Sequence, residues 1–170
     1  AKALKPRTEV IGVESARFPG LYGALKGESP AFGTSSIADG IAVREPGRIA
    51  LAAARELIDD VLLVDEGDIE QAIVMLLEIE KTVAEGAGAA ALAALVRNAD
   101  RFAGRRVGIV LSGGNIDPLT LASIVERGMV RSGRLARLTV ELRDLPGALA
   151  RVTSRLAAVG ANIEEVHHQR

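Results

Sequence analysis

The sequence of 170 residues contains no cysteine and no tryptophan, and only 2% of its residues are aromatic. The absence of cysteine excludes disulfides and thiolate-bound metals, and it is consistent with a cytoplasmic protein. Because aromatic rings are scarce, the core has to be built from Ala, Val, Leu and Ile, in keeping with a hydrophobic fraction of 48%. We therefore expect a globular chain packed through aliphatic side chains.

Long apolar runs and a strong net charge are also missing. No run approaches the roughly 18 apolar residues of a membrane-spanning helix, and the sequence shows no signal-peptide pattern. The net charge is -1 with well-mixed signs, so a basic surface for nucleic acid is not expected. The remaining classes of partner are small molecules and other proteins.

Apolar patterns divide the first 127 residues into alternating strands and helices. The run 107–111 shows no alternation, which is typical of a strand buried on both faces of a parallel sheet. Asp68 to Gln71 has the form of an N-terminal capping box. The alternation predicts a layered α/β domain, with strands at 9–14, 61–64 and 107–111 and helices at 21–26, 48–59, 68–81, 89–97 and 119–127.

The sequence changes character at Ser112, where the last apolar run gives way to Gly113 and Gly114. Asp117 and Pro118 then predict the N-cap and first residue of a helix. Ser112 should lie at the carboxyl end of a strand, the edge at which open α/β sheets bind ligands. The two glycines would let a flat ligand approach the backbone. Alternatively, Ser-Gly-Gly is only a tight turn between strand and helix.

Three segments occur together, namely Thr-Ser-Ser-Ile-Ala-Asp-Gly at 34–40, Lys-Thr-Val-Ala-Glu-Gly-Ala-Gly-Ala at 81–89 and Val-Gly-Ile-Val-Leu-Ser-Gly-Gly-Asn-Ile-Asp-Pro at 107–118. Their order and spacing resemble those of the pyridoxal-phosphate threonine ammonia-lyases (threonine dehydratases) and the related serine racemases. The resemblance covers roughly residues 1–130. It implies the three-layer, parallel-sheet part of a tryptophan-synthase-β-like, type II pyridoxal-phosphate fold.

The resemblance also implies roles for individual residues. Ser112 would hydrogen-bond the pyridine nitrogen of pyridoxal 5'-phosphate, Gly113, Gly114 and Gly40 would shape the pocket, and Glu85 would support it. A neutral hydroxyl leaves that nitrogen largely unprotonated, whereas a carboxylate would hold it protonated and strengthen the electron sink. The weaker sink suits elimination of water. By themselves, Gly40 is equally consistent with an ordinary turn and Glu85 with a helix-dipole partner.

The implied reaction converts L-threonine to 2-oxobutanoate and ammonia, with L-serine as a second substrate. The family's Schiff-base lysine and glycine-rich phosphate loop would lie upstream of Ala1, so we expect no catalytic residue here and no activity of this chain alone. The segment 1–6 resembles the last turn of a helix whose beginning is missing, which favours a fragment of a longer protein.

Glu14 is a candidate metal ligand. Racemase members of the family place a divalent cation on a carboxylate at this position, with a second carboxylate six residues later, where this sequence has Gly20. Hard cations need several oxygen ligands. Glu14 is therefore also consistent with a solvated residue at the end of a strand, and Gly20 disfavours a racemase.

After a glycine-flanked linker at 128–136, the apolar period changes. Leu138, Val140 and Leu142 alternate with polar residues and predict a half-buried strand. A helix with an apolar face should follow from about Leu149 and end at Gly160, before an extended segment over 162–168. The segments 144–149 and 160–163 resemble the start of an ACT domain, a ferredoxin-like βαββαβ module that binds amino acids.

The ACT resemblance covers residues 137–170, or one βαβ half of the module. It implies an amino-acid effector near Asp144 and Gly147, with Asn162 assisting, although Pro146-Gly147 is also consistent with a simple turn. The expected domains are therefore 1–127, linker 128–136 and 137–170. Half a module leaves a strand edge uncovered, which favours a homo-oligomer. An amino-acid-binding and oligomerising module, or a racemase of the same fold, is the alternative function.

Overall fold

The computed structural model describes residues 1–168, and it divides the chain into two compact units, one spanning Ala1–Leu135 and the other beginning at Ala136. In the first unit, β1 (Ile11–Ser15) and β2 (Asp60–Val64) form a two-stranded parallel sheet. Ile11 lies opposite Asp60, and Ser15 lies opposite Val64. Because both strands run in the same direction, Ser15 and Val64 lie together at the carboxyl edge of the sheet.

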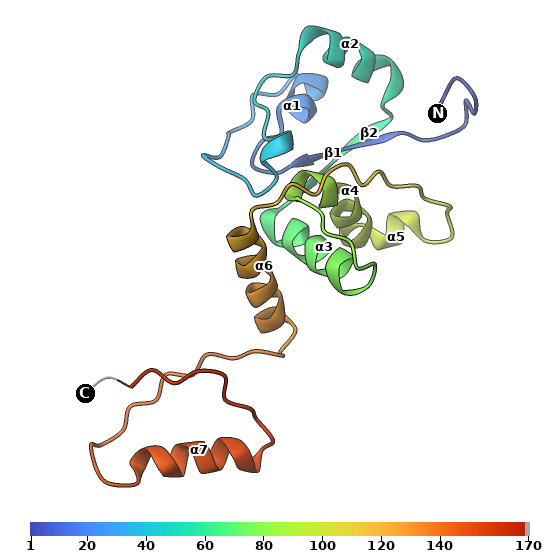
Figure 1. Cartoon of the computed structure of the whole chain (residues 1–170). Helices are drawn as coiled ribbons and strands as arrows, with labels where there is room; N and C mark the ends of the chain where they lie inside the picture. Colours follow the sequence, from blue (N-terminus) through green and yellow to red (C-terminus); the bar gives the residue numbers. More distant parts are fainter. Residues whose placement is uncertain (169–170) are drawn as a thin grey trace. The chain divides into compact units, whose positions relative to one another are not determined.

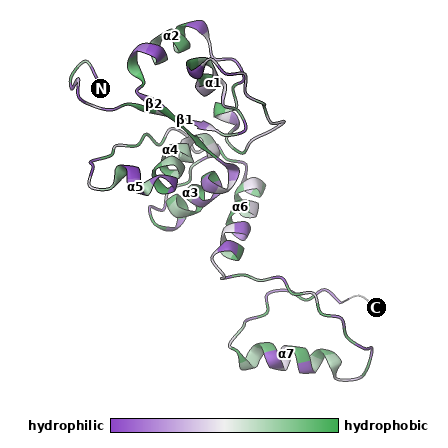
Figure 2. Cartoon of the chain, turned by 180° about the vertical axis from the view of Figure 1, so that it is seen from behind, coloured by the Kyte–Doolittle hydropathy of each residue, from purple (hydrophilic) through white to green (hydrophobic). Residues whose placement is uncertain are grey.

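Helices cover both faces of this sheet in the first unit. Figures 1 and 2 show α1 and α2 on one side of the strands and α3 and α4 on the other, so the three-layer order predicted from the sequence is present. No helix in the described residues is long and apolar enough to span a membrane. The helices of the first unit are α1 (Gly20–Lys26), the short 3-10 helix η1 (Asp39–Ile41), α2 (Arg48–Leu57), α3 (Glu66–Glu78), α4 (Gly86–Arg97), α5 (Ala99–Phe102) and α6 (Pro118–Arg131).

The core of the first unit lies where α3 and α4 pack together beneath the sheet. Ile69 and Ile73 of α3 and Ala89 and Ala93 of α4 are almost fully buried, with Val64 of β2 beside them. Figure 2 shows hydrophobic residues along the strands and on both of these helices. Alanine and glycine leave little side chain between the helix axes, so α3 and α4 can pack closely.

The capping box of α3 lies three residues earlier than predicted. Asp65, directly after β2, is the N-cap and accepts from the Asp68 amide at 2.9 Å, while Asp68 accepts from the Asp65 amide at 3.0 Å. The Asp68 amide, and then the Arg97 guanidinium, hold the pKa of Asp65 below its ordinary value. The predicted box at Asp68 and Gln71 is therefore wrong, because the strand ends early enough for Asp65 to cap the helix.

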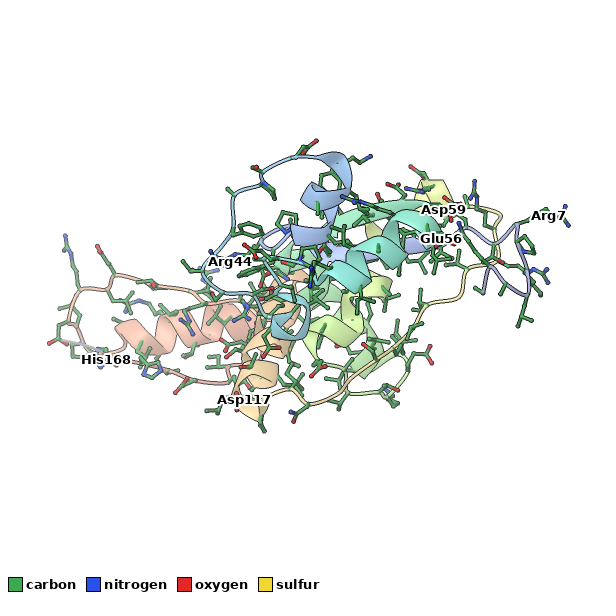
Figure 3. All side chains as sticks on the ribbon, turned by 90° about the horizontal axis from the view of Figure 1, so that it is seen from above. Arg7, Arg44, Glu56, Asp59, Asp117 and His168 are labelled. Atoms are coloured by element: carbon green, nitrogen blue, oxygen red, sulfur yellow. The ribbon has the colours of Figure 1, made fainter. Side chains whose placement is uncertain are left out.

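The predicted strand at 107–111 is also wrong for the described structure. The segment makes no strand ladder there, and its apolar side chains are exposed, Val110 to 76%. A strand needs a neighbour to satisfy its amides and carbonyls, and β1 and β2 pair only with each other in the described sheet. The helix predicted next is confirmed, since Asp117 caps α6 by accepting from the Thr120 amide at 2.8 Å (Figure 3).

Glu70 of α3 forms ion pairs with two arginines of α6. Its side chain is only 9% exposed, and its carboxylate lies 2.8 Å from Arg127 and 2.5 Å from Arg131. Between these arginines, a Cβ on Gly128 would lie 2.8 Å from a methyl carbon of Val74, so the helices approach closely there. The helix α6 extends to Arg131, beyond the predicted end at 127, and these contacts hold α6 against α3.

Replacing Glu70 with Gln should lower the free energy of unfolding by about 1–2 kcal/mol, because the neutral amide keeps only one acceptor oxygen and loses the charge that strengthens the bonds to both arginines. Glu78 on the same helix is the matched control. Its side chain and that of its ion-pair partner Arg134 are 43% and 48% exposed, so E78Q should cost less than about 0.5 kcal/mol. Urea unfolding of both variants checks this, and equal effects would contradict the fastening role of Glu70.

The described part of the second unit contains one helix, α7 (Ala148–Ala158), and no strand ladder. The predicted strand at 138–142 is therefore wrong as a paired strand, because no neighbouring strand supplies a ladder, and the segment 162–168, predicted to be extended, forms no ladder either. The predicted helix is confirmed, with Gly160 in the left-handed region just after it. Its apolar face and segment 138–142 form a shallow groove, lined by Leu138, Val140, Leu142, Val152 and Leu156.

Candidate functional site

The three segments singled out in the sequence meet around the first turn of α4. A Cβ on Gly86 would lie 2.2 Å from the carbonyl oxygen of Ile37, so segment 34–40 presses directly on the helix start. Further along that segment, a Cβ on Gly40 would lie 3.1 Å from the Cβ of Ala87. The contact between segments 34–40 and 81–89 therefore requires a residue without a side chain at position 86.

The Ser112 segment approaches α4 from another direction. A Cβ on Gly88 would lie 2.5 Å from the carbonyl oxygen of Gly113, and that same oxygen accepts from the Glu85 amide at 3.0 Å. A Cβ on Gly113 would lie 2.1 Å from Oε1 of Glu85. Glu85 is the N-cap residue of α4, but its side chain makes no capping hydrogen bond. Its carboxylate lies against Gly113 instead. Four of the predicted site residues, Gly40, Glu85, Gly113 and Gly114, thus come together.

The glycines have a role that the sequence interpretation missed. They were expected to leave room for a flat ligand, but a Cβ on Gly114 would lie 2.8 Å from the carbonyl oxygen of Val83, and one on Gly113 would strike Glu85. Their first role is to let the protein's own segments touch. Nothing in the sequence indicates which glycine of one motif lies against which residue of another. Only the structure reveals these contacts.

Ser112 is exposed beside this junction. In the part of the chain that the structure describes, its hydroxyl has no hydrogen bond to another protein group, although the backbone of the neighbouring Gly113 is bonded to Glu85. A hydroxyl on a fixed backbone that is not engaged by the protein can donate to a ring nitrogen. The residues present therefore fit the ring side of pyridoxal 5'-phosphate, and the contact itself stays a prediction.

Segment 34–40 is held by Glu66, which the sequence analysis did not single out. Oε1 of Glu66 accepts from the Ser36 hydroxyl at 2.7 Å, and Oε2 accepts from the Ile37 amide at 2.8 Å. The fully buried Ser15 at the end of β1 completes the group, 3.4 Å from both Ser36 and Glu66. A glutamate in the first helical turn is common, so the sequence offered no signal for this contact.

Glu14 has a structural role at the start of α1. Its two carboxylate oxygens accept from the amides of Leu21 and Tyr22 at 2.8 and 2.7 Å. A Cβ on Gly20 would lie 2.5 Å from the Arg44 carbonyl oxygen, so a carboxylate side chain has no room at that position. The described residues contain no group of three potential metal ligands. The cation site at Glu14 stays a prediction, and these contacts favour the capping role.

The predicted effector residues lie on the surface of the second unit. Gly147 is the N-cap of α7 and has φ 80°, a conformation that favours glycine. Asp144 precedes the turn, and Asn162 follows the helix; both are exposed. The effector site at these three residues stays a prediction.

Comparison with known proteins finds one matching family model and several similar sequences and structures. The model of the family described as pyridoxal-phosphate dependent enzyme matches residues 1–113. The chain is 48% identical to L-threonine ammonia-lyase of Geobacter sulfurreducens over 97% of its own length and 42% of that protein. Among solved structures, it resembles threonine deaminase isoform 2 of Solanum lycopersicum, with 28% identity, a TM-score of 0.64 and coverage of 76% of this chain and 37% of that one.

A second similar structure is maize serine racemase, with 28% identity, a TM-score of 0.62 and coverage of 78% of this chain and 42% of that one. The chain therefore spans about two fifths of the length of the proteins to which it is similar. The match to the ammonia-lyase, over 97% of this chain, takes in the segments that meet at α4.

Proposed function

We propose, from the premise that this chain belongs to the family of pyridoxal-phosphate-dependent enzymes, that it forms the ring-binding part of a threonine ammonia-lyase. The observation that carries the proposal is the convergence of segments 34–40, 81–89 and 112–114 on the first turn of α4. L-threonine is the proposed substrate and L-serine the second, because the similar proteins include an L-threonine ammonia-lyase and a threonine deaminase.

Bound pyridoxal 5'-phosphate would supply the electron sink for elimination of water and release of ammonia. The Ser112 hydroxyl is proposed to donate a hydrogen bond to the ring nitrogen, which stays unprotonated. Gly113 and Gly114 fix the backbone that carries this hydroxyl, and Gly40 approaches α4 from the opposite segment. The Glu85 carboxylate, which lies over Gly113, is proposed to support the pocket wall and keep the Ser112 segment in place.

The second unit is proposed to be the first half of an ACT domain with an amino-acid effector at Asp144, Gly147 and Asn162. The support is the sequence resemblance, together with a helix that starts directly after Gly147 and shares an apolar groove with segment 138–142. The uncovered apolar residues Leu138 and Val140, which are more than half exposed, support assembly into a homo-oligomer. A cytoplasmic location is part of the same proposal and rests on the absence of cysteine.

The test uses the protein expressed from the complete reading frame that contains this sequence. Purified with pyridoxal 5'-phosphate and given L-threonine, it should release ammonia and 2-oxobutanoate in equal amounts, both lost when the cofactor is removed. Conversion of L-serine to D-serine without ammonia would identify a racemase instead. Binding of isoleucine or valine with no threonine turnover would favour the amino-acid-binding module.

A further inference from the structure

The Glu66 carboxylate joins three elements at the carboxyl edge of the sheet. It belongs to the first turn of α3, it receives hydrogen bonds from Ser36 and Ile37, and it lies 3.4 Å from Ser15 at the end of β1. Each of its oxygens receives a separate bond of 2.7 to 2.8 Å. Hydrogen bonds to an ionised carboxylate are stronger than neutral ones, so this group is a firm attachment point for segment 34–40.

Glu66 is not needed to cap its own helix. Asp65 and Asp68 already form the reciprocal capping box of α3. Both Glu66 oxygens point instead to a segment that is 29 or 30 residues away in the sequence. The Glu66 carboxylate therefore holds segment 34–40 in place, whereas Asp65 and Asp68 stabilise the start of α3.

The position of that segment matters because the next residues touch the site. The Ile37 amide donates to Glu66, while the carbonyl oxygen of the same residue faces Gly86 of α4. Ala38, fully buried, follows, and Gly40 meets Ala87. The Ser36 hydroxyl oxygen also accepts from the Ala38 amide at 3.1 Å, which fixes the turn. Without the hydrogen bonds to Glu66, segment 34–40 could move away from the first turn of α4, on the side opposite Gly113.

We infer that Glu66 is a positioning residue for the cofactor site: it holds segment 34–40 against the first turn of α4 and so fixes one wall of the pocket. This inference rests on the proposed function, since the wall has a ligand to position only if the cofactor binds there. Glu66 acts through Ile37 and Gly40 and does not itself contact the ring.

The first test is independent of activity. Amide hydrogen exchange of the chain should show faster exchange at Ile37 and Ala38 in Glu66→Ala, by roughly tenfold, with exchange in the interior of α3 unchanged because its capping box remains. Glu66→Gln keeps one acceptor oxygen and should give a smaller increase. The control is Glu70→Gln on the same helix, which loosens α6 and should leave Ile37 unchanged. Unchanged exchange at Ile37 in Glu66→Ala would overturn the inference.

The second test uses the protein from the complete reading frame, titrated with pyridoxal 5'-phosphate and followed by absorbance. Glu66→Ala should raise the apparent Kd of the cofactor roughly tenfold, while E70Q should leave it near the native value. At saturating cofactor, the KM for threonine should rise by a larger factor than kcat falls. The reason is that a displaced pocket wall weakens substrate binding more than it slows the chemical step.

The outcomes separate the two claims. A native protein that does not bind the cofactor overturns the proposed function and this extension of it. A native protein that binds the cofactor, with Glu66→Ala binding it equally tightly, overturns only the positioning role. Equal loss of binding in Glu66→Ala and E70Q would show a general loss of stability and would also overturn it.

Discussion

Replacing Ser112 with Asp is expected to lower kcat for threonine deamination roughly 100-fold in the protein from the complete reading frame, the loss typical of changing one positioned electrostatic partner. A carboxylate would hold the ring nitrogen protonated and turn the ring into a stronger sink, which slows expulsion of the hydroxyl group. The absorption band of the bound cofactor should change with it. Steady-state kinetics and the absorption spectrum measure the two effects.

Three comparisons make this test specific. Ser112→Thr retains the hydroxyl and should keep most of the activity, while Ser112→Ala removes the donor and should cost roughly tenfold. Ser29→Asp adds the same charge at another exposed serine, outside the three segments, and should leave kcat and the spectrum unchanged. Native kinetics and an unchanged spectrum in Ser112→Asp would remove Ser112 from the site.

Replacing Gly86 with Ala should destabilise the chain by about 2 kcal/mol. The new Cβ would lie 2.2 Å from the Ile37 carbonyl oxygen, a backbone atom that cannot move without displacing segment 34–40. Such overpacking costs up to about 3 kcal/mol, and the better helix propensity of alanine offsets about 1 kcal/mol. Urea unfolding followed by circular dichroism measures the net change.

Gly108→Ala is the matched control for this prediction. A Cβ at Gly108 meets no atom within 4 Å, and its backbone is outside the left-handed region. Its free energy of unfolding should therefore stay within about 0.5 kcal/mol of native. If G86A and Gly108→Ala are equally stable, segment 34–40 does not press on α4 in solution.

Local signals predicted much of the fold. Asp117-Pro118 marked the start of α6, because caps depend on neighbouring residues alone. The strand predicted at 107–111 was wrong because pairing depends on what lies alongside, which an apolar run does not encode. The capping box was wrong by three residues because two aspartates compete for the same role, and the end of β2 decides between them.

The sequence named candidate residues of the site, but it did not predict how they pack together. The motifs indicated Ser112, Gly113 and Glu85, and the structure brings the backbone of Gly113 against Glu85. What the sequence could not indicate is which glycine faces which segment, or that Glu66 holds segment 34–40. The bond from the Ile37 amide to Glu66 joins residues 29 positions apart, and such contacts depend on the packed fold and leave no local pattern.

The most direct test of the central claim is the crystal structure of the protein from the complete reading frame with pyridoxal 5'-phosphate bound. We predict that the Ser112 hydroxyl lies within hydrogen-bond distance, about 2.7–3.2 Å, of the ring nitrogen, with Gly40 and Glu85 beside the ring. A ring bound elsewhere, or a ring nitrogen that faces a carboxylate in place of Ser112, would contradict the account.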